Sequence, residues 1–363
     1  MMSQADTLMD RGVAEGVFPG GVLLVSKDGK QLFCKAYGCA DIFSNTPMTR
    51  ETIFDLASLT KPLATTLAVM RLIERKKIVL DQSVASILPG FGDNDKKSIT
   101  IRNLLYHNSG LPDYREYYKD LRRLPENRRA AALRAYLVKE PLLYPVGKQT
   151  LYSDLGFMIL GWIVEKVSGK RLDRFTAEEI YAPLKLGNGS AGSLFFVDLE
   201  FAGVENDIFA ATEVCPWRKI LLKGAVHDDN AYALGGVAGH AGLFGSAGAV
   251  FKLLSFLLDI FHGRVVGPDL FDRNLIREFL RRDEHAGRTL GFDTPSPEGS
   301  GSGRLFSKNS VGHLGFTGTS FWMDPERSVI IILLTNRVHP SRQNTKIKAF
   351  RPELHDAVME KIL

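Results

Sequence analysis

Sequence typical of β-strands lies near both ends of the chain, and helix-forming sequence lies between them. Residues 329–334 form an unbroken apolar run, Val-Ile-Ile-Ile-Leu-Leu, as expected of a strand covered on both faces. Near the other end, Gly21–Val25 and Gln31–Ala36 flank Lys27-Asp28-Gly29-Lys30. An Asp-Gly pair between apolar runs predicts a tight hairpin, because glycine readily adopts a positive φ. We therefore predict one sheet that is built from both termini.

The remaining elements follow from apolar spacing and turn residues. Two more strand segments, Thr319–Met323 and Val329–Thr335, are separated by a turn at Asp324–Arg327. Helices are expected at Ser58–Lys77, Ile99–Tyr106, Arg129–Lys139, Leu155–Val167, Val250–Phe261 and Arg351–Leu363. The predicted fold class is α+β (mixed α/β), an antiparallel sheet flanked by helices plus an all-helical lobe. Residues 1–55 and 230–363 would form the sheet domain, and residues 56–229 the all-helical domain.

Composition excludes several classes of protein. With 363 residues, of which 45% are hydrophobic and 24% charged, the chain is globular and has enough apolar material for a sizeable core. A net charge of +5 is too small for a protein built around nucleic-acid phosphates. No segment is long and apolar enough to span a membrane, and Gly299–Gly303 lacks the strand and helix of a nucleotide-binding loop.

The N-terminal residues and the cysteines indicate a compartment. The first residues include Asp6 and no apolar core segment, so they do not form a signal peptide. Cys34, Cys39 and Cys215 cannot all pair within one chain, and we expect buried free thiols. The predicted location is therefore the cytoplasm, or the periplasm if a leader was removed. The oligomeric state cannot be derived from the sequence.

Ser58-Leu59-Thr60-Lys61 lies at the predicted start of the first long helix. Residues three apart share a helix face, so the Ser58 hydroxyl and the Lys61 amine can meet. Pro62 places them in the first turn, where the helix tolerates a residue without an N–H. There, unpaired N–H groups can hold an oxyanion, and the helix dipole favours a neutral lysine that could act as base for the serine. The alternative is a capping serine beside a surface lysine.

Two further segments carry polar residues beside helices or strands. Tyr152-Ser153-Asp154 precedes a helix, where Asp154 could simply be the N-cap and Tyr152 a core aromatic residue. Residues 312–320, Gly-His-Leu-Gly-Phe-Thr-Gly-Thr-Ser, precede a predicted strand, and their glycines suggest that something approaches the backbone closely. The alternative for this segment is a turn that leads into the strand.

Together, and in this order, the three segments resemble the serine β-lactamase and penicillin-binding protein superfamily, in particular its class C-like branch. Ser58-Leu59-Thr60-Lys61 matches the first motif, and Tyr152-Ser153-Asp154 resembles Tyr-x-Asn with Asp in place of Asn. His313-Leu314-Gly315 stands where Lys-Thr-Gly is usual. Residues 101–112 and 235–244 are also similar to family segments, and the resemblance extends from about Pro19 to the end of the chain.

The resemblance implies a serine hydrolase that forms an acyl-enzyme on an ester, amide or lactam carbonyl, without a cofactor or metal. Ser58 would be the nucleophile, Lys61 would assist its deprotonation, and Tyr152 would carry a proton to the leaving group. The N–H groups of Ser58 and Phe316 would form the oxyanion hole. Asp154, His313, Gly315 and Thr317 would complete the substrate site. Lys61 and a protonated His313 would depress the Tyr152 pKa.

The departures from the motifs bear on the substrate. Because His313 and Leu314 replace the Lys and Thr that help to bind a β-lactam carboxylate, Thr317 or Arg337 would have to substitute for them. The expected substrate is therefore a small molecule or peptide with an acyl group. An esterase or a D-Ala-D-Ala peptidase fits better than an efficient β-lactamase. A catalytically silent relative that binds peptides or a partner is the main alternative. A metal enzyme that uses His107, His227, Asp228, Asp229 or His240 lacks a recognisable ligand spacing.

Overall fold

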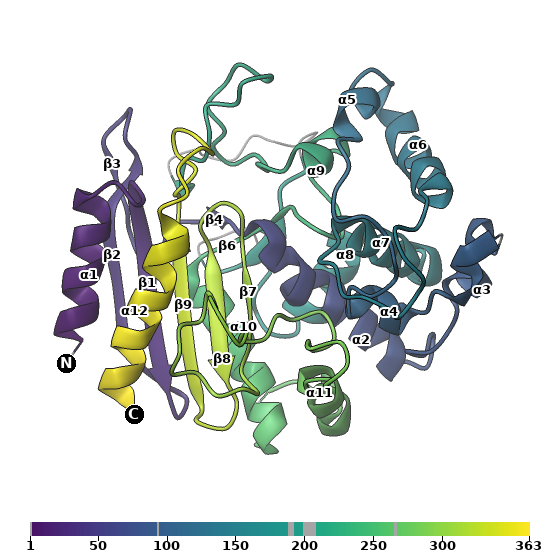
Figure 1. Ribbon diagram of the computed structural model, residues 1–363. Coiled ribbons are helices and arrows are strands. Elements are labelled where there is room, and N and C mark those ends of the chain that lie inside the picture. Colours follow the sequence, from purple (N-terminus) through teal and green to yellow (C-terminus); the bar gives the residue numbers. More distant parts are fainter. Residues whose placement is uncertain (1, 93, 188–191, 199–207, 265–266) are drawn as a thin grey trace.

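A six-stranded antiparallel sheet, built from both ends of the chain, forms the centre of one half of the molecule (Figure 1). The computed structural model describes residues 2–92, 94–187, 192–198, 208–264 and 267–363. The strand order is β3-β2-β1-β9-β8-β7. The strands are β1 (Gly20–Lys27), β2 (Lys30–Asp41), β3 (Thr46–Pro47), β7 (Val311–Leu314), β8 (Ser320–Asp324) and β9 (Val329–Thr335). The prediction of a mixed fold with one sheet from both termini is confirmed.

The two central strands explain why the sheet needs both termini. β1 pairs with β9 in antiparallel register, with Val22 opposite Leu334. Both strands are buried on both faces, as the apolar run predicts. Alternate residues face two separate cores: Val22 and Leu24 lie in the larger one, whereas Leu23 and Val25 lie in the smaller one. The β1–β2 hairpin turns at Asp28 and Gly29, which have φ values of 52° and 74°, as a tight Asp-Gly turn requires.

Helices cover both faces of the sheet. α1 (Ser3–Ala14) and α12 (Ile347–Ile362) lie side by side on one face and enclose the smaller core. α10 (Ala247–His262) packs against β1 and β9 on the other face, and α11 (Arg273–Leu280) packs against α10. No helix within the described ranges is both long and apolar enough to cross a bilayer.

The other half of the described chain is mainly helical. α7 (Asp154–Ser168) lies at its centre and contacts α2 (Leu67–Glu74), α4 (Ile101–Leu105), α6 (Glu126–Lys139) and α8 (Leu172–Thr176). α7 ends at Gly169, whose φ of 71° makes it a left-handed cap. The shorter helical elements are α3 (Val84–Ile87), α5 (Tyr118–Leu121), α9 (Asp229–Ala233), η1 (Ala57–Leu59), η2 (Lys61–Thr66), η3 (Pro89–Phe91), η4 (Asn94–Ser98) and η5 (Ala177–Tyr181).

The structure differs from the sequence-based expectation in three places. The helix predicted from Ser58 to Lys77 is a 3₁₀ turn, a π-helical turn and then α2, which ends at Glu74. β5 (Leu194–Phe196) lies within the range predicted to be all helical and joins β4 (Phe54–Asp55) and β6 (Leu243–Gly245) in a second sheet. All three cysteines are free, but only Cys215 is buried. The division into residues 1–55 with 230–363 and residues 56–229 stays a prediction.

Candidate active site

Ser58 lies in a strained turn directly after β4. The residue before it, Ala57, has a φ of +48°, which is uncommon for a residue other than glycine. The buried carboxyl group of Asp55 stabilises this turn: it accepts hydrogen bonds from the Ala57 N–H at 2.9 Å and from the His227 N–H at 2.6 Å. Burial raises the Asp55 pKa despite these two bonds. The turn therefore presents Ser58 at the start of η1, where the motif predicts it.

Lys61 is fully buried beneath Ser58 and is surrounded by three acceptors. Its Nζ lies 3.1 Å from Ser58 Oγ, 2.7 Å from Asp154 Oδ1 and 3.1 Å from the carbonyl oxygen of His240. Burial alone would lower the Lys61 pKa, but the charge of Asp154, together with Tyr152, outweighs burial and leaves the pKa above its usual value. The expectation of a neutral lysine is therefore wrong, because the helix dipole is a weaker influence than a carboxylate in contact.

Tyr152 reaches the same place from the segment before α7. Its ring lies 4.8 Å from Lys61 Nζ, and its hydroxyl oxygen is buried. Burial raises the Tyr152 pKa; Lys61 acts against this effect and Asp154 adds to it. The predicted depression of the pKa is therefore wrong, because desolvation outweighs the effect of Lys61. Tyr152 is a neutral phenol in the resting protein.

Ser153, and not Asp154, is the cap of α7. The Ser153 hydroxyl accepts a hydrogen bond from the Gly156 N–H. The backbone N–H of Ser153 donates to His107 Nδ1 at 3.0 Å. Asp154 is thereby released from capping and pairs with Lys61. Burial, with Arg288 and Lys61, holds the His107 pKa well below its usual value, so this ring is neutral. Sequence reasoning missed His107 as a support of the tyrosine segment, although it lies in a segment similar to the family.

His313 lies on the short strand β7, and the turn that leads into the next strand, β8, follows it at residues 315–319. Its Nδ1 donates to the Leu314 carbonyl oxygen at 3.0 Å, because a carbonyl can only accept, and its buried Nε2 has no partner within the described part of the chain. Burial first, then Lys61 and Arg288, keep the His313 pKa well below its usual value. This shift favours a neutral His313 ring over the protonated form expected above, and the ring stands beside Tyr152 with ring centroids 5.8 Å apart.

The turn after β7 is fixed by its own side chains. The Thr317 hydroxyl donates to the Asp55 carbonyl oxygen at 2.7 Å, and Thr319 donates to that of Leu56 at 3.1 Å. A Cβ on Gly315 would lie 2.0 Å from Thr319 Oγ1 and 2.9 Å from the Leu56 carbonyl oxygen, so only glycine fits there. Thr317 thus connects the turn to the backbone before Ser58, and its hydroxyl is not directed at a substrate.

Arg337 holds the next residue of that turn. Its guanidinium donates to the Phe316 carbonyl oxygen through Nε at 2.8 Å and also through Nη2, and it stacks on the Phe316 ring. Nη1 donates to the carbonyl oxygens of Arg342 and Asn344. The Phe316 N–H has no acceptor among the residues that the structure describes. The side chain proposed as a substitute carboxylate anchor therefore holds Phe316 by its carbonyl group, next to the peptide whose N–H would serve the oxyanion hole.

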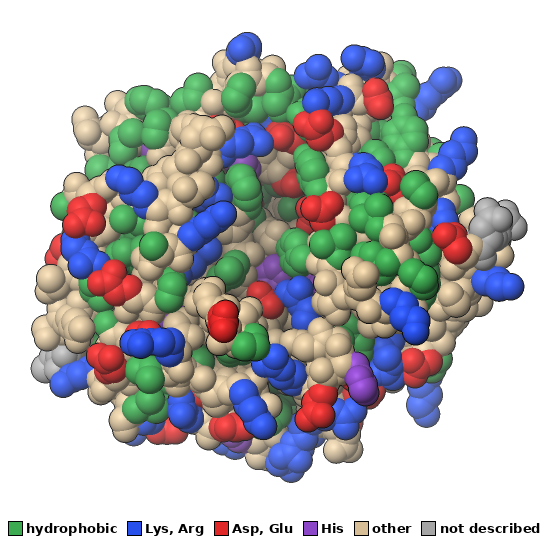
Figure 2. All heavy atoms as spheres, viewed as in Figure 1, with side chains coloured by type: hydrophobic (Ala, Val, Ile, Leu, Met, Phe, Trp, Pro, Cys, Tyr) green, Lys and Arg blue, Asp and Glu red, His purple; other side chains and the backbone are tan. Residues whose placement is uncertain are grey.

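Ser58, Tyr152 and Phe316 line two adjoining cavities, which lie in the hollow at the centre of Figure 2. One cavity, of about 480 Å³, is lined by basic side chains and one acidic one: Arg288, Arg337, Arg342, Lys348, Arg351 and Asp293. The other, of about 440 Å³, is lined by Asp113, Glu116, Asp154, Asp228, Asp229 and Arg342. Figure 2 shows the same polarity, with blue side chains along one rim of the hollow and red ones on the other.

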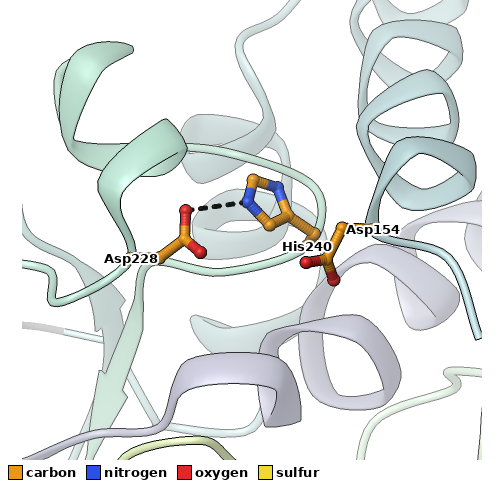
Figure 3. A group of neighbouring side chains, drawn as sticks. All are labelled: Asp154, Asp228 and His240. Carbon is orange, nitrogen blue, oxygen red and sulfur yellow. Dashed lines mark hydrogen bonds and ion pairs between the residues drawn. The ribbon is translucent and has the colours of Figure 1, made fainter. Parts of the chain in front are cut away.

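A cluster of Asp154, Asp228 and His240 is the one group within the described ranges whose atoms are placed to bind a metal ion (Figure 3). His240 Nε2 lies 2.9 Å from Asp228 Oδ1, and this contact helps to hold the Asp228 pKa well below its usual value against burial. Because the Lys61 ammonium already lies 2.7 Å from Asp154, a metal ion there would face a cation in contact. His227 and Asp229 lie outside this cluster: His227 pairs with Glu213, and Asp229 with Arg218.

Comparison with known proteins agrees with this geometry. The family model described as Beta-lactamase matches residues 5–353. An N-acetylmuramyl-L-alanine amidase of Bacillus subtilis is 35% identical, over 93% of this chain and 81% of the relative. A candidate D-alanyl-D-alanine carboxypeptidase of Escherichia coli K12 is 33% identical, over 91% of this chain and 82% of the relative.

Solved structures show the same fold at lower identity. The hydrolase EstCE1, described as having promiscuous acyltransferase activity, superposes with a TM-score of 0.75 at 22% identity and covers 98% of both chains. A penicillin-binding protein homologue from Caulobacter crescentus gives a TM-score of 0.72 at 20% identity, over 100% of this chain and 97% of the other. The chain therefore belongs to the beta-lactamase family, within the serine β-lactamase and penicillin-binding protein superfamily, and is a serine hydrolase of that family.

Proposed function

We propose that Ser58 is the nucleophile of an amidase or carboxypeptidase that cleaves an amide bond next to an alanine residue in short peptides. The observation that carries the proposal is the contact of Ser58 Oγ with Lys61 Nζ at 3.1 Å, at the junction of two oppositely charged cavities. A buried cation in contact with a hydroxyl that also faces a cavity is suited to nucleophilic catalysis. A capping serine beside a surface lysine would not need this arrangement.

The proposed steps use residues on both sides of the cleft. Ser58 attacks the carbonyl carbon, and the developing oxyanion is held by the N–H groups of Ser58 and Phe316. One such donor typically contributes about 3–4 kcal/mol in the transition state. Tyr152, as a neutral phenol, is suited to donate its proton to the leaving nitrogen. Water then hydrolyses the acyl-enzyme, with the same groups acting in reverse.

The relatives and the basic cavity support the substrate class. Both curated relatives carry the name of an enzyme that acts on an amide bond at alanine. In the basic cavity, Arg351 is buried, has no carboxylate partner among the described residues, and leaves its Nε without an acceptor. Burial, helped by Arg337, lowers the Arg351 pKa to about 9, which still leaves it charged at neutral pH. A buried cation of this kind favours a substrate that carries a carboxylate.

β-Lactams are expected to have a lower kcat/KM than the peptide amide, and esters are expected to be cleaved as well. An ester is the more reactive acyl donor and should be turned over without specific binding. A β-lactam should acylate Ser58, but the neutral His313 offers no charge to its carboxylate.

We further infer a reducing compartment, which is supported by the three free cysteines.

A parallel assay tests the proposal. The purified protein and its Ser58→Ala variant are given a D-Ala-D-Ala peptide, an N-acyl-alanine amide, a short p-nitrophenyl ester and a chromogenic cephalosporin. We expect release of alanine or amine from at least one amide at a kcat/KM above that for the cephalosporin, and no turnover by Ser58→Ala. Activity on the ester alone would contradict the amide assignment, and an active Ser58→Ala variant would contradict the nucleophile.

A further inference from the structure

The pair formed by Lys61 and Asp154 distinguishes this site from the motif that it resembles, in which an uncharged asparagine stands at the position of Asp154. We propose that Asp154 is the final acceptor of the Ser58 proton and that Lys61 carries the proton between them. Asp154 touches neither Ser58 nor a substrate in this scheme and acts only through Lys61. The inference rests on the proposed function, because it needs Ser58 as nucleophile.

At rest, the Lys61 ammonium group has no lone pair that could accept the Ser58 proton. The Lys61 ammonium donates hydrogen bonds to Ser58 Oγ and to the His240 carbonyl oxygen, each at 3.1 Å, and forms an ion pair with Asp154 Oδ1 at 2.7 Å. A neutral amine would have only two N–H groups, and its lone pair would face one of these oxygens. Lys61 is therefore a donor to Ser58, and it can take the serine proton only if it passes one of its own to another group.

Asp154 is placed to receive that proton. Its carboxylate lies 2.7 Å from Nζ, whereas a carbonyl oxygen such as that of His240 cannot be protonated in this pH range. Asp228 is a second carboxylate in the cluster of Figure 3, with its pKa held well below its usual value, so it remains charged.

The other groups around Lys61 are poorer acceptors. Tyr152 already carries its proton, since burial raises its pKa. His107 and His313 face Lys61 from the segments after α4 and on β7, and burial together with Arg288 and Lys61 keeps both rings neutral and weakly basic. Asp228 is paired with His240. Among the described residues, Asp154 is thus the basic group in direct contact with the carrier.

The proton and charge balance closes without another reactant. One proton moves from Lys61 Nζ to Asp154 Oδ1, the Ser58 proton moves to Nζ, and Ser58 Oγ forms its bond to the carbonyl carbon. Lys61 ends as it began, an ammonium ion. The charge of the Asp154 carboxylate has passed to the tetrahedral oxyanion. When that intermediate collapses and the C–N bond breaks, Tyr152 gives its proton to the leaving nitrogen and takes one from Lys61. Lys61 in turn recovers one from Asp154, whose carboxylate is charged again.

The test compares kcat/KM for a p-nitrophenyl ester across pH 5–10 in the wild type, Asp154→Asn and Asp154→Glu. Asp10→Asn, an exposed change on α1, is the matched control and should behave as wild type. We expect Asp154→Asn to lose at least about 100-fold at pH 7, within the range for a proton-transfer group. Its rate should then climb about tenfold per pH unit up to the Lys61 pKa, because only deprotonated Lys61 can accept the proton and burial lowers that pKa once the Asp154 charge is gone. Asp154→Glu should regain part of the wild-type kcat/KM near pH 7.

Three results would overturn the inference. The first is an Asp154→Asn variant that keeps the wild-type rate and pH profile. The second is an Asp154→Asn variant that loses the same factor at every pH, since a uniform loss indicates only misplacement of Lys61. The third is an Asp154→Glu variant that recovers no activity at pH 7 although its circular dichroism spectrum is that of the wild type. Failure of the proposed function is a separate outcome, in which the wild type is inactive or Ser58→Ala is active.

Discussion

The two walls of the cleft use their side chains in different ways. On the helical wall, which comprises residues 57–66 and 152–154, side chains meet one another: Lys61 contacts Ser58 and Asp154 directly. On the β7 wall, residues 311–319, side chains hold the backbone: Thr317 and Thr319 donate to the carbonyl oxygens of Asp55 and Leu56. In the proposed mechanism, the helical wall would supply charge and proton transfer, whereas the β7 wall would supply a fixed peptide N–H.

The largest effect on the β7 wall is expected from Gly315→Ala. Its Cβ would come within 2.9 Å of the Leu56 carbonyl oxygen and 2.0 Å of Thr319 Oγ1, so the turn must move and carry the Phe316 N–H with it. We expect kcat to fall about 100-fold, the effect of losing one oxyanion donor. Steady-state kinetics measure this loss. Gly248→Ala, at an exposed position of α10 where the Cβ would make only an ordinary contact with Ser246 Oγ at 3.9 Å, is the control. A Gly315→Ala variant with wild-type activity would show that the position of the turn is unimportant.

The next largest effect is on the free energy of unfolding and its dependence on pH. It is tested on one histidine from each side of the cleft. His107 and His313 have folded-state pKa values well below the unfolded value of about 6.5. The unfolded chain therefore binds more protons as pH falls through 6.5, so the stability present above that pH is lost. Each histidine should contribute up to about 1.4 kcal/mol per pH unit below 6.5.

Urea unfolding at pH 7 and pH 5 measures this dependence. His107→Gln and His313→Gln should each reduce the difference in unfolding free energy between the two pH values. His285→Gln, at an exposed position, should leave it unchanged. A wild-type protein that is equally stable at both pH values would contradict the assignment of two buried neutral rings.

The smallest effect is expected from Thr317→Val, which separates the two roles considered for this residue. Loss of the hydrogen bond to the Asp55 carbonyl oxygen should cost about 1 kcal/mol of stability. We expect kcat to fall several-fold at an unchanged KM, and Thr317→Ser, which keeps the hydroxyl, to restore it. An increase in KM at constant kcat would instead mean that the hydroxyl contacts the substrate.

The parts of the fold that were predictable from sequence depend on short-range patterns. The β9 run, the Asp28-Gly29 hairpin and helix α7 with its Gly169 cap all follow from residues within a few positions of one another. β5 was missed because it is three residues long and pairs with a distant strand, β6. No local pattern marks a strand of that kind.

The site shows the same limit. The spacing of Ser58 and Lys61 predicted their contact, because three residues along a helical turn fix it. The charge of Lys61 was not predictable, since it depends on Asp154, which lies about ninety positions away in sequence and 2.7 Å away in space. The use of Thr317 and Arg337 on backbone carbonyls likewise depends on the packing of two distant segments.

The central claim is that Ser58 forms the acyl-enzyme, and mass spectrometry of the labelled protein tests it most directly. The wild type and Ser58→Ala are incubated with a fluorophosphonate probe, and the labelled peptides are identified after digestion. We predict one mass addition per chain, located on the peptide that contains Ser58 and absent from Ser58→Ala. Label on any other residue, or label that persists in Ser58→Ala, would contradict the claim.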